Sequence, residues 1–435
     1  MNFDENDHYH YNEWTDHSAY IPSYCAEVEH LGLNRRLLLK DFDKCNLDAR
    51  IKEQFATWDA IWKSEQYKID TEPAQPYSHE LADQLTALAK SNLKLVKDIL
   101  TESLNTDIKL NWSQLKNHST FPVPNPESDL LSEIDQVPFP TEPLFKDLPN
   151  KPKEEDFEPK LSFFDKLLGS GAKRKKAEAQ AAYQSTYARW EEEVEKIEAE
   201  NLQLGNDYLV KLAEAEAQKK SLIEKCEKEV NRWHLAHKEF AERKNKHNEA
   251  VSRWEVDYQQ GKEDAVLSYY DYILHYSAYP DFVSKFFKLQ YRAVEKLLVV
   301  DYLIPTSEQV PRVSEVRFVP PRGILKDYLL SDRQFSRVYN DAVYKMVLRT
   351  AYEIFEADLP GNVNQFVYNG WVRNAREGQD LICLISMNVS KEDFNSMNLH
   401  YIEPQSCFQD LRGRANADLT HLNSVEPWVE TGFTL

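Results

Sequence analysis

The 435-residue chain is long enough for two or three domains, and its formal net charge is −19. The charge is −16 up to Pro280 and only −3 after it. Because acidic surfaces repel phosphate, this balance gives no support for an extended DNA-binding surface. The five cysteines lack metal-ligand spacing and are typical of reduced cytosolic thiols.

The sequence also argues against secretion and membrane insertion. Residues 1–5 are acidic and polar, whereas a signal peptide is basic and then apolar. No apolar run approaches the roughly 20 residues that a membrane-spanning helix needs. We therefore expect a cytoplasmic protein with no membrane partner.

Residues 1–116 predict an N-terminal helical domain. Asn46 can cap a first long helix and Ser78 a second, each with a regular apolar stripe, and a shorter helix is expected around residues 24–39. The first 23 residues are rich in His, Tyr and Asp and predict a solvated or loosely docked tail. The alternative is a metal site at the clustered histidines His8, His10 and His17. No Cys or acidic ligand stands at a fixed spacing from these histidines, which argues against that alternative.

Residues 117–171 predict a semi-rigid linker. Nine prolines lie between Pro122 and Pro159, and proline favours the extended polyproline geometry. The isolated apolar residues Phe139 and Phe145 can dock along a helix surface. A PxxP ligand for an SH3-like partner is a generic alternative.

Residues 172–260 predict one long helix, because the stretch has no proline, a single glycine at Gly205, and many Ala, Glu, Lys and Gln. Apolar residues recur at spacings of three and four, with a phase slip near Leu212, which is the heptad pattern of a coiled coil. Such a helix needs a partner, either a second copy of the chain or the same stretch folded back near Gly205. The expected oligomerisation residues are Tyr183, Tyr187, Trp190, Val194, Ile197, Leu204, Tyr208, Leu222, Val230, Trp233, Phe240, Val251, Trp254 and Tyr258.

A basic run opens this long helix. Positive charge at a helix start is unfavourable with the helix dipole, so the run could contact an anion or an acidic surface of another chain. The alternative is a solvated charge run. Its residues are Lys173, Arg174, Lys175 and Lys176.

Residues 261–435 predict an α+β domain in the order β-β-β-α-β-β-α-α. The first two strands form a hairpin, and its second strand, around residues 297–302, is almost continuously apolar and hence central. Ser331 or Asp332 caps the long helix. The expected fold class is therefore α plus α+β: an N-terminal helical segment, a long heptad coiled coil, and a C-terminal α+β domain with an approximately five-stranded sheet.

One face of that C-terminal helix is basic. Its apolar residues occupy another face, so the helix can pack on the sheet and present the basic side outward. The basic face could meet DNA phosphate, an acidic surface of the same assembly, or solvent only, with Arg349 paired to Glu353 at i, i+4. Its residues are Arg333, Arg337, Lys345 and Arg349.

Few residues suggest chemistry. The sequence has no Walker loop, GxGxxG, paired CxxC or HExxH, so we assign no catalytic, cofactor-binding or metal-binding residue and no cofactor. His234 and His237 fit a polar coiled-coil flank better than a metal site. Asp301 would be a site candidate if it were buried, but an edge or interface position is the preferred interpretation. Cys383 is expected to act as a small hydrophobe, and glycine beside Trp371 suggests a bulge or a close backbone approach.

Several stretches, taken in order, resemble a known family. They are Pro122-Val123-Pro124-Asn125-Pro126, the segment 162–176 that leads into the helix, residues 297–305, 314–319, 348–358, 367–372 and 389–394. Together they resemble the region that precedes the nuclease domain in bacterial Mrr-type restriction endonucleases, over about residues 110–435, with 348–358 as the sharpest stretch.

The resemblance implies a nuclease domain of the PD-(D/E)xK type after this region, with an acidic residue and a (Glu/Gln)-x-Lys strand that hold a divalent metal. Gln66-Tyr67-Lys68 fits the three-letter pattern, but it follows a helix and lacks the preceding acidic strand. No catalytic residue can therefore be transferred to this chain, and whether it acts as an enzyme stays open.

Two functions follow as hypotheses. In the first, the chain is a dimerising scaffold or regulatory part of a bacterial DNA-restriction or phage-defence effector, which positions a nuclease activity not present in this chain. Its expected partners are a second copy, a nuclease domain or subunit, and DNA. In the second, it is a stand-alone coiled-coil adaptor with no nucleic-acid role.

Overall fold

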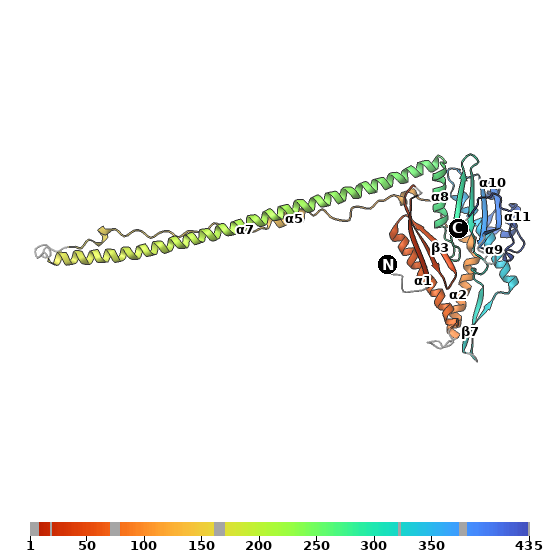
Figure 1. The fold of residues 1–435 in the computed structure, drawn as a ribbon, viewed down its shortest axis with the longest axis horizontal. Helices are drawn as coiled ribbons and strands as arrows, with labels where there is room; N and C mark the ends of the chain where they lie inside the picture. Colours follow the sequence, from red (N-terminus) through yellow and green to blue (C-terminus); the bar gives the residue numbers. More distant parts are fainter. Residues whose placement is uncertain are drawn as a thin grey trace. The chain divides into compact units, whose positions relative to one another are not determined.

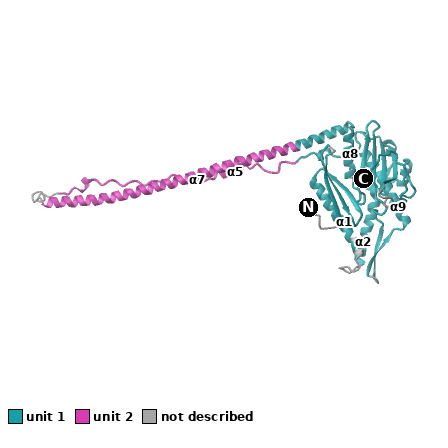
Figure 2. Ribbon diagram, viewed as in Figure 1, with its two compact units in different colours: residues 1–118, 244–435 teal, residues 119–243 magenta. Residues whose placement is uncertain are grey.

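The computed structural model describes residues 8–17, 20–69, 79–160, 170–320, 323–373 and 381–433. The chain divides into two compact units (Figure 2). Unit 1 comprises residues 1–118 and 244–435, and unit 2 comprises residues 119–243. Helix α7 (Ser170–Gln259) runs through unit 2 and contributes its last turns to unit 1. The fold contains both helices and strands, which agrees with the sequence prediction of a chain that has helical and α+β parts.

A five-stranded mixed sheet forms the centre of unit 1 (Figure 1). Its order is β10-β9-β8-β5-β4, and only β5 and β8 run parallel. Every residue of β5 is buried, which confirms that the apolar run is the central strand. The β4–β5 hairpin is also confirmed. The bounds are β4 (Phe287–Arg292), β5 (Leu297–Leu303), β8 (Gln365–Arg373), β9 (Leu381–Ser390) and β10 (Arg414–Ala415).

Helices cover this sheet and form the main core with it. Ser331 caps α9 through a capping box with Gln334, which confirms the first of the two predicted caps. Ser390 caps α10 by accepting a hydrogen bond from the backbone N–H of Asp393. The core extends from the sheet through α8 and α9 to the end of α7. The bounds are α8 (Glu263–Tyr276), α9 (Asp332–Ala357), α10 (Lys391–Asn395) and α11 (Pro404–Asp410), with the 3-10 turns η3 (Leu399–Tyr401) and η4 (Leu419–His421).

The predicted third strand does not join the main sheet. It is β6 (Val313–Val319), which pairs only with β7 (Ile324–Leu329) in a separate hairpin. This hairpin packs its Val316 and Leu325 side chains on Ala82 and Leu85 of α2 (His79–Lys97). The main sheet reaches five strands through β10, a two-residue strand too short to carry an alternating pattern.

The N-terminal region is not the helical segment that we expected. Three antiparallel strands, β1–β3, precede the helices, so residues 9–16 of the predicted tail form a strand and the helix predicted at residues 24–39 is two strands. Burial alternates along β2 and β3, and this period-two pattern is the one that strands require. The bounds are β1 (Tyr9–Asp16), β2 (Ser23–His30), β3 (Arg35–Asp41), α1 (Lys44–Ile69), α3 (Ile99–Leu104) and α4 (Trp112–Leu115).

Helix α1 packs on β2 and β3 (Figure 1). It buries Trp58 in a small second core. Asp43, rather than the predicted Asn46, caps this helix, because its carboxylate accepts the backbone N–H of Asn46 at 3.0 Å. The cap predicted at Ser78 lies outside the described residues. The three-stranded sheet joins the rest of unit 1 through Asp281, which accepts hydrogen bonds from the Trp58 indole at 3.1 Å and from Arg35.

Unit 2 consists of α7 and a Pro-rich segment that lies along it (Figure 2). We call residues 121–157 the strap. It contains α5 (Glu127–Asp135) and the 3-10 turn η1 (Glu154–Phe157), and between them residues 137–153 have no regular secondary structure. Helix α7 continues through Gly205, so the fold-back considered there is wrong. A long heptad coiled coil is not confirmed, because the strap accompanies the predicted stripe instead of a second long helix.

Candidate functional site

The apolar stripe of α7 is covered by the chain's own strap, which runs antiparallel to the helix. The Phe121 ring lies 5.8 Å from the Trp233 ring and 5.5 Å from the Phe240 ring, between centroids. At the other end the Phe157 ring lies 5.7 Å from the Tyr183 ring. The strap and the α7 residues that it contacts are together called the arm.

Aliphatic and cation–π contacts fill the space between these ends. Leu130 and Ile134 of α5 pack on Cys226, with Leu222 and Val230 at the edge of the same cluster. The Lys219 ammonium lies 5.6 Å from the Phe139 ring centroid, and the Lys151 ammonium lies 5.3 Å from the Tyr187 ring centroid. The expectation that Phe139 and Phe145 dock on a helix is confirmed, since the Phe145 ring lies 3.8 Å from where a Cβ on Gly205 would stand.

Helix side chains also satisfy backbone groups of the strap, which extended proline-rich chain cannot do for itself. The indole N–H groups of Trp233 and Trp190 each donate at 2.8 Å, to the carbonyls of Val123 and Pro149. Between them, Asn201 accepts the Lys146 N–H at 2.9 Å and donates to the Lys146 carbonyl at 2.9 Å. Three side chains therefore fix the register of the strap on the helix.

The predicted oligomerisation residues fall into two groups. Those up to Phe240 form the stripe in the arm, where they are half-buried except for Leu204, which is exposed. Val251, Trp254 and Tyr258 instead lie in the core of unit 1, where they are almost fully buried. Contact between copies through these residues is untested and stays a prediction.

The basic run at the start of α7 is mostly solvent-exposed. The Arg174 guanidinium lies 3.5 Å from the Glu178 carboxylate, an i, i+4 pair on the helix surface. Lys173 and Lys176 are exposed, and Lys175 is half-buried. A contact with an anion or a partner chain stays a prediction for these four residues.

The predicted basic face of α9 is wrong, because this helix is covered on more than one side. Arg333 and Arg337 are exposed, but Lys345 is half-buried and donates to the Lys97 carbonyl at 2.7 Å. Arg349 is only 2% exposed. The sheet packs on one face of α9 while α2 and α3 pack on another, so an apolar stripe alone did not reveal which basic residues are buried.

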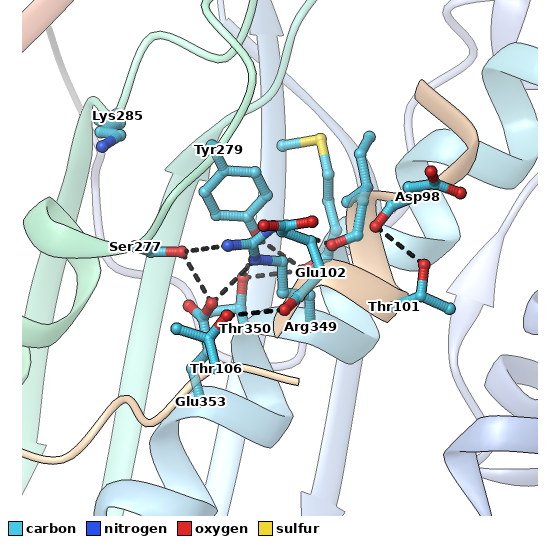
Figure 3. Close-up of polar contacts among 12 residues, drawn as sticks. Asp98, Thr101, Glu102, Thr106, Ser277, Tyr279, Lys285, Arg349, Thr350 and Glu353 are labelled. Atoms are coloured by element: carbon cyan, nitrogen blue, oxygen red, sulfur yellow. Dashed lines mark hydrogen bonds and ion pairs between the residues drawn. The ribbon is translucent and has the colours of Figure 1, made fainter. Parts of the chain in front are cut away.

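Arg349 is the centre of a buried polar network (Figure 3). Its guanidinium donates to Glu353 at 2.8 Å, to the Ile99 carbonyl at 2.8 Å and to the Ser277 hydroxyl at 3.0 Å. Ser277 in turn donates to the same Glu353 oxygen at 2.7 Å, and the Tyr279 ring lies 4.2 Å from the guanidinium carbon. Burial opposes the charge on Arg349, but the Glu353 carboxylate outweighs it and raises the Arg349 pKa. The network ties α3, the end of α8 and α9 together.

A cavity of about 260 Å³ adjoins this network. Glu353 and Ser103 line it, and within the described chain the Glu353 Oε2 atom and the Ser103 hydroxyl have no hydrogen-bond partner. Polar groups of this kind usually bind ordered water, so we interpret the cavity as a hydrated margin of the network.

Lys285 is a second buried cation, and it lies apart from Arg349 (Figure 3). Its backbone φ is 55°, and its ammonium donates to the His275 carbonyl at 3.0 Å. Burial is the main cause that lowers the pKa of Lys285 to about 7; the nearby Arg50 charge also lowers this pKa, while the Glu353 carboxylate raises it. Sequence reasoning missed this residue because a lysine in a loop carries no burial signal.

Asp301 is buried in the central strand, so the edge position that we preferred is wrong. Its carboxylate accepts hydrogen bonds from Asn369 at 3.0 Å and from the Trp371 indole at 2.7 Å. Asn369 also donates to the Val429 carbonyl at 3.0 Å. This network holds the C-terminal segment against the sheet, so we assign it a structural role.

The remaining candidates are structural. A register shift falls beside Gly370, where an added Cβ would lie 2.6 Å from Ile385, which confirms the predicted bulge and close approach. Cys383 is buried, and burial raises its pKa to about 12. The His237 ring stacks on Trp233, with 4.9 Å between centroids, and no three potential metal ligands gather anywhere in the described ranges.

Comparisons with protein families, curated proteins and solved structures gave no match to this chain. In the part of the chain that the structure describes, no helix has both the length and the apolar character needed to cross a bilayer. The arm is therefore the feature on which a functional proposal has to rest.

Proposed function

We propose that this chain is a scaffold or regulatory part of a bacterial DNA-restriction or phage-defence effector. In this role its arm sets the separation between unit 1 and a partner, and the nuclease activity comes from outside the residues of this chain. The observation that carries the proposal is the arm itself. A 90-residue helix spans about 135 Å at 1.5 Å per residue, and its apolar stripe is covered by the strap.

The restriction context is supported by the pattern resemblance of residues 110–435 to the region before the nuclease domain of Mrr-type enzymes. The second candidate, an adaptor without a nucleic-acid role, is favoured by the net charge of −19, which disfavours contact with phosphate. The two functions differ in whether a nuclease associates with the chain.

The first experiment compares DNA cleavage by the purified recombinant chain with DNA cleavage by the chain isolated from the cells that carry it. Recombinant chain with Mg²⁺ or Mn²⁺ is expected to leave plasmid DNA intact, whereas chain isolated from cells that carry it is expected to bring metal-dependent cleavage with it. Cleavage by the recombinant chain that a point substitution abolishes would overturn the proposal. Absence of cleavage in the isolated material would favour the adaptor.

The second experiment tests the arm. Gly205→Pro breaks α7 within unit 2, because proline removes a helix hydrogen bond and clashes with the preceding turn. Gly205→Ala is the matched control, since its Cβ meets only an ordinary contact with Phe145. We expect the proline variant to lose the associated cleavage and the alanine variant to keep it. Equal cleavage with both variants would show that an intact arm is not required.

A further inference from the structure

Exposed apolar side chains occur halfway along the arm, both on the strap and on α7. On α7 Leu202 is 68% exposed and Leu209 is 59% exposed, and on the strap Leu144 is 94% exposed. The pairing of Lys146 with Asn201 places these strap and helix residues at the same level of the arm. We call the exposed set the mid-arm patch: Leu144, Phe145, Leu148, Leu202, Leu209 and Val210.

The helical part of the patch is a second, short heptad stripe. Residues at spacings of three and four are exposed and lie about a quarter turn from the strap-facing Asn201 and Gly205, at 100° per residue. The stripe is apolar except for one central asparagine, and a single asparagine at such a position fixes the register of a helix pair. Its members are Ala199, Leu202, Asn206, Leu209 and Ala213.

Charge on the two sides of the patch favours one orientation of a helix pair. Residues 191–200 contain six Glu and one Lys, a net charge of −5, whereas residues 211–220 contain three Lys and two Glu, a net charge of +1. A parallel pair would place the two −5 segments side by side. An antiparallel pair centred near Asn206 instead places Glu192 and Glu195 near Lys220 of the second copy, so opposite charges meet.

We propose that the mid-arm patch binds the same patch of a second copy of this chain, with the two α7 helices antiparallel. An exposed apolar patch bordered by charged residues is typical of a protein interface. The proposal deepens the scaffold function above and rests on it, because it names the partner that the arm engages. The strap of each copy stays on its own helix, so this interface does not use the oligomerisation residues that the heptad pattern predicts.

The first test is the molar mass of the full chain, measured by light scattering and by sedimentation at several concentrations. We expect a dimer for the natural chain. Leu202→Asp with Leu209→Asp should raise the dimer dissociation constant roughly 100-fold or more, because two apolar contacts become buried charges. Leu235→Asp is the control: Leu235 is 64% exposed on the same helix but outside the patch, and its variant should remain dimeric.

A monomeric natural chain at tens of micromolar would overturn the proposal, and so would a double variant that still dimerises with an unchanged helical circular dichroism spectrum. If the Leu235→Asp control also dissociated, the interface would not be confined to the mid-arm patch. That result would overturn the proposal as well.

The second test addresses orientation. Lys220→Glu should weaken the dimer about tenfold, and adding Glu192→Lys and Glu195→Lys in the same chain should restore it, because in an antiparallel pair these positions face each other. Glu192→Lys with Glu195→Lys alone separates the two orientations. It should weaken an antiparallel dimer, because the new lysines oppose Lys220, whereas it would strengthen a parallel dimer by reducing the repulsion between the two −5 segments. A strengthened dimer would contradict the antiparallel arrangement. Both tests need neither DNA nor a nuclease, so their failure leaves the nuclease-association experiment unaffected.

Discussion

One helix, α7, is covered in two different ways along its length. In unit 1 its Val251, Trp254 and Tyr258 side chains are almost fully buried in a large core built from α8, α9 and the sheet. In unit 2 the same kind of stripe is only half-buried, under a single extended strap. The comparison shows that an apolar stripe predicts that something covers a helix, but not what covers it.

The largest expected difference between the two regions is the cost of removing a tryptophan. Trp254 is fully buried and donates to the Ala265 carbonyl at 3.0 Å, so Trp254→Ala should lower the free energy of unfolding by about 3–5 kcal/mol. Trp233→Ala should leave the urea unfolding of unit 1 unchanged and only speed hydrogen exchange in the strap. If both variants lowered the free energy of urea unfolding by the same amount, the two regions of α7 would not differ in how much their cover contributes to stability.

Removal of the buried Arg349 charge should lower the folding stability of unit 1 about as much as Trp254→Ala does. Arg349→Met leaves the Glu353 carboxylate buried without its cation, which typically costs about 3–5 kcal/mol of folding stability. Arg337→Met on the same helix is the exposed control and should change stability by less than about 0.5 kcal/mol. Thermal unfolding measures both, and Glu353→Gln added to Arg349→Met should recover part of the loss.

Lys285 gives the folding stability of unit 1 a dependence on pH. Its pKa is about 7 in the folded chain and near 10.4 in the unfolded chain, so the unfolded chain binds more protons between these values. The contribution of Lys285 to stability should therefore rise from pH 7 to pH 10 and stay constant below pH 7. The difference between natural chain and Lys285→Met, measured by urea unfolding at each pH, should show this slope; a flat difference would contradict it.

The smallest expected effect is local to the arm. Asn201→Ala removes both hydrogen bonds to Lys146, each worth about 1 kcal/mol, so the Lys146 amide should exchange with solvent faster by roughly thirtyfold. Gln203→Ala is the control, because Gln203 is exposed on the same helix and is not part of the mid-arm patch. Unchanged exchange in Asn201→Ala would mean that the aromatic contacts alone hold the strap.

Parts of the fold could be predicted because they depend on short stretches of sequence. The β5 run, the Ser331 cap and the extent of α7 each follow from local patterns, and the structure confirms all three. The N-terminal strands were missed because β1 exposes most of its side chains and short apolar runs suit a helix or a strand equally. The strap on α7 was only partly foreseen, through Phe139 and Phe145, because its pairing joins residues far apart in the chain.

The sequence by itself determined that α7 is long and carries an apolar stripe, because helix propensity and heptad spacing are properties of neighbouring residues. Only the tertiary structure decided that a proline-rich strap covers that stripe, that Arg349 is buried and that the Asp301 carboxylate is buried against Asn369 and Trp371. The physical reason is that the partner of an apolar stripe or a charge is chosen among distant segments. The spacing of residues along one helix does not reveal which of those segments gives the lowest free energy when it packs there.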